Sequence, residues 1–268
     1  MEDLTPAVAL AEQAARTAGD YLIAHQDQTR IIAQKAPDDP LLDADLEAQR
    51  LILQTLRSGL PQLGFLSEEA EDQRHRARDY WVVDPVDGSQ NYLHKSTQFA
   101  IAIALILDQH VQAGIIYLPA REWLFSAIRG RGAICNGQPI RVSSAATLEQ
   151  AMIHFGEFGR DNRGQVPNQQ FQAFATLANQ AQRIRISGSS SCDLALLASG
   201  AIDGFVMHMV NQWDVAAGEL LLSEAGGRTS VHPTGRGPMR INSNMVLHSE
   251  LVQLLTGLDE THFPLILV

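Results

Sequence analysis

One twelve-residue run constrains the fold of this chain more than any other. Residues 81–92 read Trp-Val-Val-Asp-Pro-Val-Asp-Gly-Ser-Gln-Asn-Tyr. The apolar start predicts a buried strand. The proline favours an extended conformation in the residue before it, so Asp84 should occupy the last extended position of that strand. The turn can then bring Asp87 back to the same opening, where two carboxylates repel each other unless a cation lies between them.

The residues after the acid pair indicate which ligand would bind beside such a cation. Gly88 allows a close backbone approach, and Gly88 and Ser89 offer N–H groups to which a phosphate could bind. A hard cation and a phosphate at one strand end indicate metal-assisted hydrolysis of a phosphate ester. The plainer alternative is an Asx turn whose two carboxylates are solvated.

Composition narrows the class of protein. The 268 residues are 45% hydrophobic, enough for a large core, yet no apolar run is long enough to predict a membrane span. The formal net charge of −10 disfavours nucleic acid as a partner, although a bound metal would still admit a small anionic substrate. The two cysteines, Cys135 and Cys192, lack metal-binding spacing and no charged leader opens the chain, which favours reduced thiols in a cytoplasmic protein.

The first half of the chain predicts helices packed on a largely antiparallel sheet. Thr5 as cap and Pro6 at the first helical position favour a helix over residues 5–26, and leucines at helical spacing predict a second helix. Asn136-Gly137 between two apolar residues is typical of a type I′ hairpin. Strands are expected at 31–32, 64–66, 80–84, 97–107, 111–118 and 122–128, with polar connections at 35–40 and 70–79.

The second half alternates strands and helices in the manner of an α/β unit. Gly226 and Gly227 should end the last helix. We place the junction near residues 143–150, which divides the chain into an α+β half, 1–145, and an α/β half, 146–268, packed as one compact unit. Strands are expected at 152–155, 184–186 and 203–209, and helices at 171–181, 189–199 and 213–225.

Further acidic residues could contribute to the same site. Glu68 ends a short strand and could reach the cation of Asp84, because strand ends in one sheet converge on one rim; surface charge is the alternative. Asp43 and Asp45 both begin a helix, so one can cap it and leave the other for chemistry. Asp214 opens a helix whose small residues suit close packing, and it could equally be an N-cap.

A serine-rich turn at residues 188–191 lies between a predicted strand and a predicted helix. Such turns bind anions through backbone N–H groups and hydroxyls, although they are also ordinary N-caps. The sequence has no H-E-x-x-H motif, which argues against a zinc protease, and neither a G-x-S-x-G elbow nor a P-loop.

Taken together, these motifs resemble the inositol monophosphatase family of metal-dependent, lithium-sensitive phosphatases. They follow the family's order and spacing across nearly the whole chain. The resemblance implies a layered αβαβα sandwich, a homodimer, and two or three Mg²⁺ ions at the junction of the two halves. The matching segments are Ser-Glu-Glu at 67–69, the run at 81–92, Gly-Ala-Ile-Cys-Asn-Gly at 132–137, Gly-Ser-Ser at 188–190, Trp-Asp-Val-Ala-Ala-Gly at 213–218 and Glu-Ala-Gly-Gly at 224–227.

The resemblance implies a set of metal ligands at the matching positions of this chain. Glu68, Asp84 and the backbone carbonyl of Val86 would bind the first Mg²⁺. Asp84, Asp87 and Asp214 would bind the second, and a third, weaker ion would lie near Glu68.

The resemblance also implies the catalytic residues, which are Asp45, Glu68 and Ser89. A metal would lower the pKa of a water that attacks phosphorus, while Ser89 orients this water and passes its proton toward Asp45. The implied phosphate and substrate contacts are Asp87, Gly88, Ser89, Gly188, Ser189, Ser190 and Met207.

Departures from the family pattern bear on the substrate. Met207 aligns with an acidic residue that grips the inositol hydroxyls in typical members, which weakens the expectation of myo-inositol phosphate but not of phosphatase chemistry. We therefore expect a small phosphorylated metabolite, inositol monophosphate or a related polyol phosphate, as substrate. Two alternatives stay open. One is a nucleotidase acting on adenosine 3′,5′-bisphosphate, favoured by Ser-Glu-Glu at 67–69, and the other is a family member with a non-catalytic regulatory role.

Overall fold

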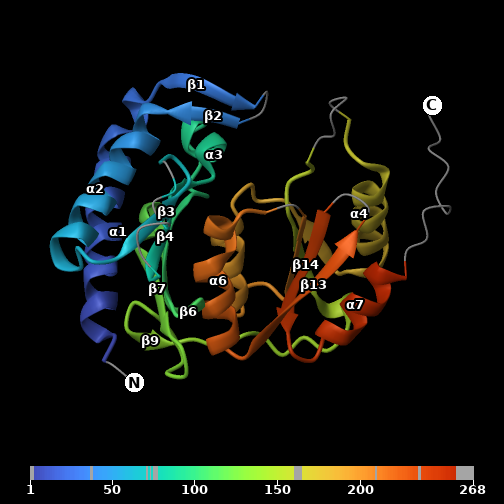
Figure 1. The fold of residues 1–268 in the computed structure, drawn as a ribbon. Helices are drawn as coiled ribbons and strands as arrows, with labels where there is room; N and C mark the ends of the chain where they lie inside the picture. Colours follow the sequence, from blue (N-terminus) through green and yellow to red (C-terminus); the bar gives the residue numbers. More distant parts are fainter. Residues whose placement is uncertain are drawn as a thin grey trace.

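Five layers, helix, sheet, helix, sheet and helix, make up the computed structural model of the chain (Figure 1). The layered αβαβα sandwich expected from the sequence is therefore confirmed. The helices are α1 (Thr5–His25), α2 (Asp43–Gly59), α3 (Ser89–Leu93), α4 (Asn168–Gln180), α5 (Ser190–Ala198), α6 (Gln212–Glu224) and α7 (His248–Thr256), with 3-10 turns η1 (Gln26–Gln28), η3 (Pro119–Arg121) and η4 (Leu148–Gln150). The structure describes residues 3–36, 39–70, 72, 74, 78–159, 165–208, 210–234 and 237–257.

The first sheet has seven strands in the order β3-β4-β5-β6-β7-β8-β9. Only β3 and β4 pair in parallel, so the expectation of a largely antiparallel sheet is confirmed. Asn136 and Gly137, at φ 48° and 78°, make the predicted tight hairpin turn. The strands are β3 (Gly64–Ser67), β4 (Tyr80–Asp87), β5 (Ala100–Leu107), β6 (His110–Leu118), β7 (Trp123–Ile128), β8 (Ala133–Cys135) and β9 (Gln138–Pro139).

The two faces of β5 show why the layers stack as they do. Its larger side chains, such as Ile101 and Ile103, join the core under α1 and α2. Its alanines face the other way and join the core shared with α5 and α6. At Gly114 of the neighbouring strand, an added Cβ would lie only 2.7 Å from the carbonyl oxygen of Ala217. Small residues therefore let the backbone of α6 approach the sheet closely.

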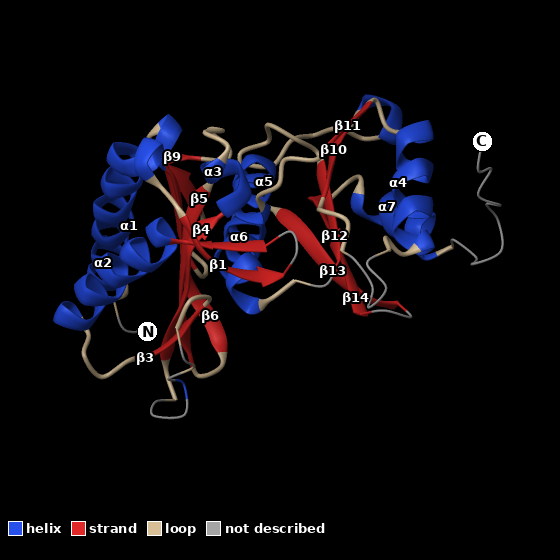
Figure 2. Ribbon diagram, turned by 90° about the horizontal axis from the view of Figure 1, so that it is seen from above, coloured by secondary structure: helices blue, strands red, loops and turns tan. Residues whose placement is uncertain are grey.

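The second sheet lies on the far side of α5 and α6, as the view from above shows (Figure 2). Its order is β11-β10-β12-β14-β13. The pairs β11–β10 and β10–β12 are parallel, and the pairs β12–β14 and β14–β13 are antiparallel. Helices α4 and α7 cover its outer face (Figure 1). Strands β13 and β14 and helix α7 were not predicted from the sequence. The strands are β10 (Met152–Phe155), β11 (Arg183–Arg185), β12 (Gly204–His208), β13 (Gly227–Thr234) and β14 (Gly237–Asn244).

Three local predictions need correction. Thr5 is not the cap of α1: Leu4 precedes the helix, and the carboxylate of Asp3 accepts hydrogen bonds from the Thr5 N–H at 3.2 Å and the Thr5 hydroxyl at 2.7 Å. Residues 35–36 and 39–40 of the expected polar connection instead belong to strands β1 (Ile31–Ala36) and β2 (Asp39–Leu42), which pair antiparallel. The strand expected at 80–84 continues through the acid turn to residue 87.

Two further expectations remain predictions. Half of the polar connection at 70–79 falls outside the described residues. The division of the chain into halves 1–145 and 146–268 also stays a prediction. Within the described part of the chain, no helix is long and apolar enough to cross a membrane.

Candidate functional site

The acid turn at the end of β4 is buried at Asp84 and half-buried at Asp87. The register between β4 and β5 shifts between Asp84 and Asp87, so the strand bulges at this point. Asp84 Oδ1 accepts a hydrogen bond from the Val86 N–H at 3.1 Å, which is the Asx turn of the plainer alternative. Yet Asp84 is only 2% exposed. Its carboxylate has therefore lost most of its hydration.

Burial and mutual repulsion dominate the electrostatics of the two β4 acids. Burial raises the pKa of Asp84 well above its usual range, and the negative charges of Glu68, Asp87 and Asp214 raise it further. Burial also raises the pKa of Asp87 to about 6, although the Ser191 N–H donates a hydrogen bond to its carboxylate. These acids therefore lie close enough together to disfavour one another's charge.

Two helices present an acid to the site in the same way, from the third residue of the helix. Asp45 in α2 accepts a hydrogen bond from the Leu42 N–H at 2.8 Å, and Asp214 in α6 accepts one from the Asn211 N–H at 2.6 Å. In each carboxylate one oxygen accepts a hydrogen bond from the N-terminus of its own helix, and the other oxygen can contact another group. Neither residue occupies the N-cap position itself, but both cap their helix from its third residue, as the plainer alternative of helix capping proposed in part.

The two helix acids also have raised pKa values. Burial raises the pKa of Asp45 to about 7, and the charges of Glu69 and Glu68 add to it. Burial, together with the charge of Asp87, raises the pKa of Asp214 to about 7. Asp43 behaves oppositely, because it accepts hydrogen bonds from Thr29 and Arg30 and its pKa is lowered. Of the two acids at the start of α2, Asp45 is the one directed to the site.

Ser89 connects the acid turn with Asp45. Its Oγ lies 2.9 Å from the carbonyl oxygen of Val86 and 3.3 Å from Asp45 Oδ1, so the hydroxyl proton can be donated to either. Gly88 precedes it with φ 93°, a conformation that favours glycine, and this turn starts the short helix α3. The structure thus brings together the predicted hydroxyl and acid.

A lysine that was not predicted as a site residue forms an ion pair with Glu68. Lys35 of β1 donates hydrogen bonds of 2.7 Å to Glu68 Oε1 and to Glu69 Oε1, and it lies 3.3 Å from Asp39. Burial would lower the pKa of Lys35, but the two glutamates outweigh burial and raise it. The ammonium group provides a positive charge where the resemblance implies a metal ligand. No sequence signal identified Lys35, because its position depends on the pairing of β1 with β2.

In the serine turn at residues 188–191, Ser189 caps the helix α5 and Gly188 allows the sharp change of chain direction before it. Ser189 is the N-cap of α5 and its hydroxyl accepts a hydrogen bond from the Cys192 N–H at 3.2 Å. Gly188 precedes it with φ 79°, and Ser190 opens the helix. Met207 of β12 is 1% exposed and packs in the apolar cluster between this helix layer and the second sheet. It therefore offers no polar group to a ligand.

We tested whether these residues suit a divalent metal ion. Within the described ranges, no three His, Cys, Asp or Glu side chains are arranged as a ready-made metal site. The chemistry of the donors nevertheless fits, because carboxylate and carbonyl oxygens are the ligands that Mg²⁺ prefers. Burial, and the charges of neighbouring acids, raise the pKa values of Asp84, Asp87 and Asp214, and a bound cation would offset both effects. The residues fit a hard cation in charge and donor type, and binding it would require their side chains to adjust.

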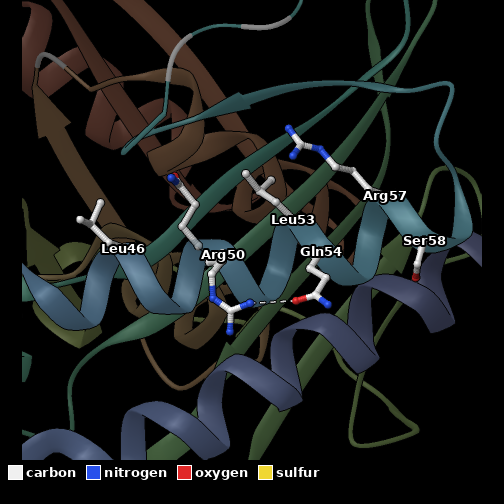
Figure 3. A pocket seen from close by; sticks show the side chains of 7 residues that line it. Leu46, Arg50, Leu53, Gln54, Arg57 and Ser58 are labelled. Carbon is white, nitrogen blue, oxygen red and sulfur yellow. Dashed lines mark hydrogen bonds between the residues drawn. The ribbon is translucent and has the colours of Figure 1, made fainter.

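A separate pocket of about 600 Å³ lies along α2 (Figure 3). Arg50 donates a hydrogen bond to Gln54 at 2.9 Å within it. None of the predicted site residues lines this pocket, which is lined by Leu46, Gln49, Arg50, Leu53, Gln54, Arg57 and Ser58.

Comparison with known proteins agrees with the resemblance noted in the sequence. Residues 3–259 match the family model described as the inositol monophosphatase family. A Xylella fastidiosa protein named Nus factor SuhB is 38% identical over 224 residues, covering 83% of this chain and 80% of that protein. An inositol-1-monophosphatase from Rhizobium meliloti is 34% identical over 240 residues, covering 87% of each chain.

Solved structures share the fold. The extragenic suppressor protein suhB from Bartonella henselae superposes with a TM-score of 0.86 at 31% identity, covering 94% of this chain and 98% of that one. The similarity extends over all five layers, because it covers nearly the whole of both chains.

Proposed function

Because the chain belongs to the inositol monophosphatase family, we propose that it is a Mg²⁺-dependent phosphatase acting on inositol monophosphate or a related polyol phosphate. The observation that carries this proposal is the set of mutually repelling carboxyls at Asp84, Asp87 and Asp214. Mutually repelling acids of this kind gain most from a divalent cation, which lets all of them ionise together.

The residues of this chain divide into ligands and proton carriers. Glu68, Asp84 and the carbonyl of Val86 would hold one Mg²⁺, and Asp84, Asp87 and Asp214 a second, with a third near Glu68. When bound, the metal would supply Lewis-acid chemistry, lowering the pKa of the attacking water and neutralising phosphate charge. For the carbonyl of Val86 to serve, the hydroxyl of Ser89 would have to turn away from it toward Asp45.

Proton transfer would run from Ser89 to Asp45. With a pKa of about 7, the Asp45 carboxyl is poised to accept a proton near neutral pH. The hydrogen bond from the Leu42 N–H holds its other oxygen in place. The backbone turns around Gly88 and Gly188 would hold the phosphate oxygens, since positive φ values expose N–H groups there.

Phosphate release from inositol 1-phosphate, with and without Mg²⁺, tests this function. Asp87→Asn and Asp214→Asn should each lower turnover at least about 100-fold, because each removes a ligand charge. Asp20→Asn, which changes an exposed acid of α1, is the matched control. Turnover near that of the control in both site variants would overturn the metal assignment.

The proposal also includes a cytoplasmic homodimer, as the family resemblance implies. Light scattering of the purified chain tests the dimer, and a monomer at micromolar concentration would contradict it. A nucleotidase is not favoured, because the relatives described above are named inositol-1-monophosphatase or Nus factor SuhB.

A second candidate is a regulatory role that needs no catalysis. It is favoured by the name Nus factor SuhB, carried by the Xylella fastidiosa relative and by one from Pseudomonas aeruginosa that is 34% identical. The net charge of −10 favours a protein partner over direct contact with nucleic acid. Complementation of a deletion strain by the Asp87→Asn variant distinguishes the two. Full rescue supports the regulatory role, and no rescue supports the enzyme.

A further inference from the structure

The turn at Gly188, before α5, contacts the acid turn at the end of β4. A Cβ added to Gly88 would lie 3.2 Å from the Gly188 carbonyl oxygen and 3.2 Å from Ser189 Cβ. The acid turn of β4 therefore packs directly against the turn before α5. A group beside Gly188 would therefore be a neighbour of a phosphate ester bound over the N–H groups of these two turns.

Glu157 provides such a group. A Cβ added to Gly188 would lie 3.2 Å from Glu157 Oε1, and also 3.1 Å from Asn91 Nδ2 and 3.4 Å from Asn91 Oδ1. Glu157 follows β10 and is exposed, so its carboxylate lies at the rim of the site rather than in the core. The Asn91 amide is fixed, because its Nδ2 donates to the carbonyl oxygens of Gln98 at 2.7 Å and Ser187 at 2.8 Å.

Met207 on the neighbouring strand β12 cannot provide this recognition. Met207 is apolar and buried, and the end of β12 touches the end of β10 at Gly156, where an added Cβ would lie 3.1 Å from Met207 Cβ. The missing side chain at Gly156 lets the two strand ends come this close. The next residue, Glu157, is the acid that this end of the second sheet places beside Gly188.

A carboxylate in this position selects one kind of ligand chemistry. It repels the phosphate group, so it favours a substrate only where it faces the alcohol part of the ester. It accepts hydrogen bonds and donates none, so the alcohol must carry donors. Hydroxyl or ammonium groups close to the ester oxygen meet this requirement, whereas a plain aryl or alkyl alcohol does not.

We propose that Glu157 binds the alcohol part of the substrate and selects phosphate esters whose alcohol carries hydroxyl or ammonium groups near the ester oxygen. This inference rests on the proposed phosphatase function and adds the residue that sets its substrate class.

Equilibrium binding tests the inference separately from turnover. The probes are inositol 1-phosphate, O-phosphoethanolamine and phenyl phosphate, measured by calorimetry with Ca²⁺ as the hard cation. Glu157→Gln keeps the shape but removes the charge, and should weaken binding of at least one donor-bearing ester about tenfold relative to phenyl phosphate, as expected for a lost charged hydrogen bond. The larger loss identifies whether hydroxyl or ammonium is the donor. Glu149→Gln, at an exposed position of the 3-10 turn η4, is the matched control.

The outcomes separate the two proposals. Equal weakening of all three esters, no weakening, or no binding of any ester to the unaltered chain would overturn the role of Glu157. Selective weakening of donor-bearing esters supports it. Absence of phosphate release from a bound ester in Mg²⁺ would overturn the proposed function while leaving the binding result to stand.

Discussion

Asp45→Asn should make the metal-free protein more stable while impairing catalysis. Asp45 is buried at the start of α2, and burial raises its pKa from 3.8 to about 7. The amide of asparagine has nearly the same shape and can still accept the hydrogen bond from the Leu42 N–H. The substitution therefore removes a charge that the folded state disfavours, without creating a cavity.

The sign and size of the effect follow from linkage between protonation and folding. The folded state holds the Asp45 proton more tightly than the unfolded state, so the wild-type protein loses stability as pH rises from about 4 to about 7. A separation of about 3 pH units at 1.36 kcal/mol each gives a ceiling of about 4 kcal/mol. Asparagine does not titrate. The variant should gain about 2–4 kcal/mol over wild type at pH 8 and less than about 1 kcal/mol at pH 4.5.

Urea unfolding in EDTA at these two pH values, followed by circular dichroism, measures the difference. Asp43→Asn is the matched control, because that acid has a lowered pKa and its loss should slightly destabilise the protein at pH 8. Turnover of Asp45→Asn should fall at least about 100-fold. An equal stability difference at both pH values, or a less stable variant at pH 8, would refute the reasoning.

Three further predictions concern Lys35, the acid turn and inhibition. Lys35→Gln should lower the Mg²⁺ concentration for half-maximal activity about fivefold. The reason is that Lys35 no longer competes with Mg²⁺ for Glu68 through a partly exposed ion pair of about 1 kcal/mol. A magnesium titration that shows no change would count against this competition. Gly88→Ala should destabilise the protein by about 2 kcal/mol and lower kcat/KM, because φ is 93° and the new Cβ would lie 3.0 Å from the Gln98 carbonyl oxygen. Gly130→Ala shares the positive φ but meets no atom within 4 Å, so in thermal unfolding it should lose clearly less stability. Millimolar Li⁺ should inhibit phosphate release, and unchanged turnover would contradict the family-based expectation.

The strand that carries the acid turn was predictable because its residues obey local rules. Proline after Asp84 extends the chain, and the flanking apolar residues predict burial. The small residues of α6 likewise predicted its close packing, which the contact of Gly114 with Ala217 shows. The type I′ turn at Asn136 followed from its sequence alone.

The parts that escaped prediction lack such local signals. Only the first two residues of β1, Ile31 and Ile32, were predicted to form a strand. The rest of β1 is exposed and small or polar, so no alternation of apolar and polar residues marks it, and the position of Lys35 follows from that part of the strand. Strand β13 lies at a sheet edge and is nowhere fully buried. Glu157 gains its position only because tertiary packing brings the end of β10 beside Gly188, which no short sequence window can reveal.

The central claim is that Asp84, Asp87 and Asp214 share divalent cations. Anomalous diffraction from crystals soaked in Mn²⁺, an ion that favours the same oxygen ligands, tests it most directly. The account predicts anomalous peaks within about 2.2 Å of carboxylate oxygens from all three residues. Crystals in which Mn²⁺ binds elsewhere, while these three carboxylates stay without a peak between them, would contradict it.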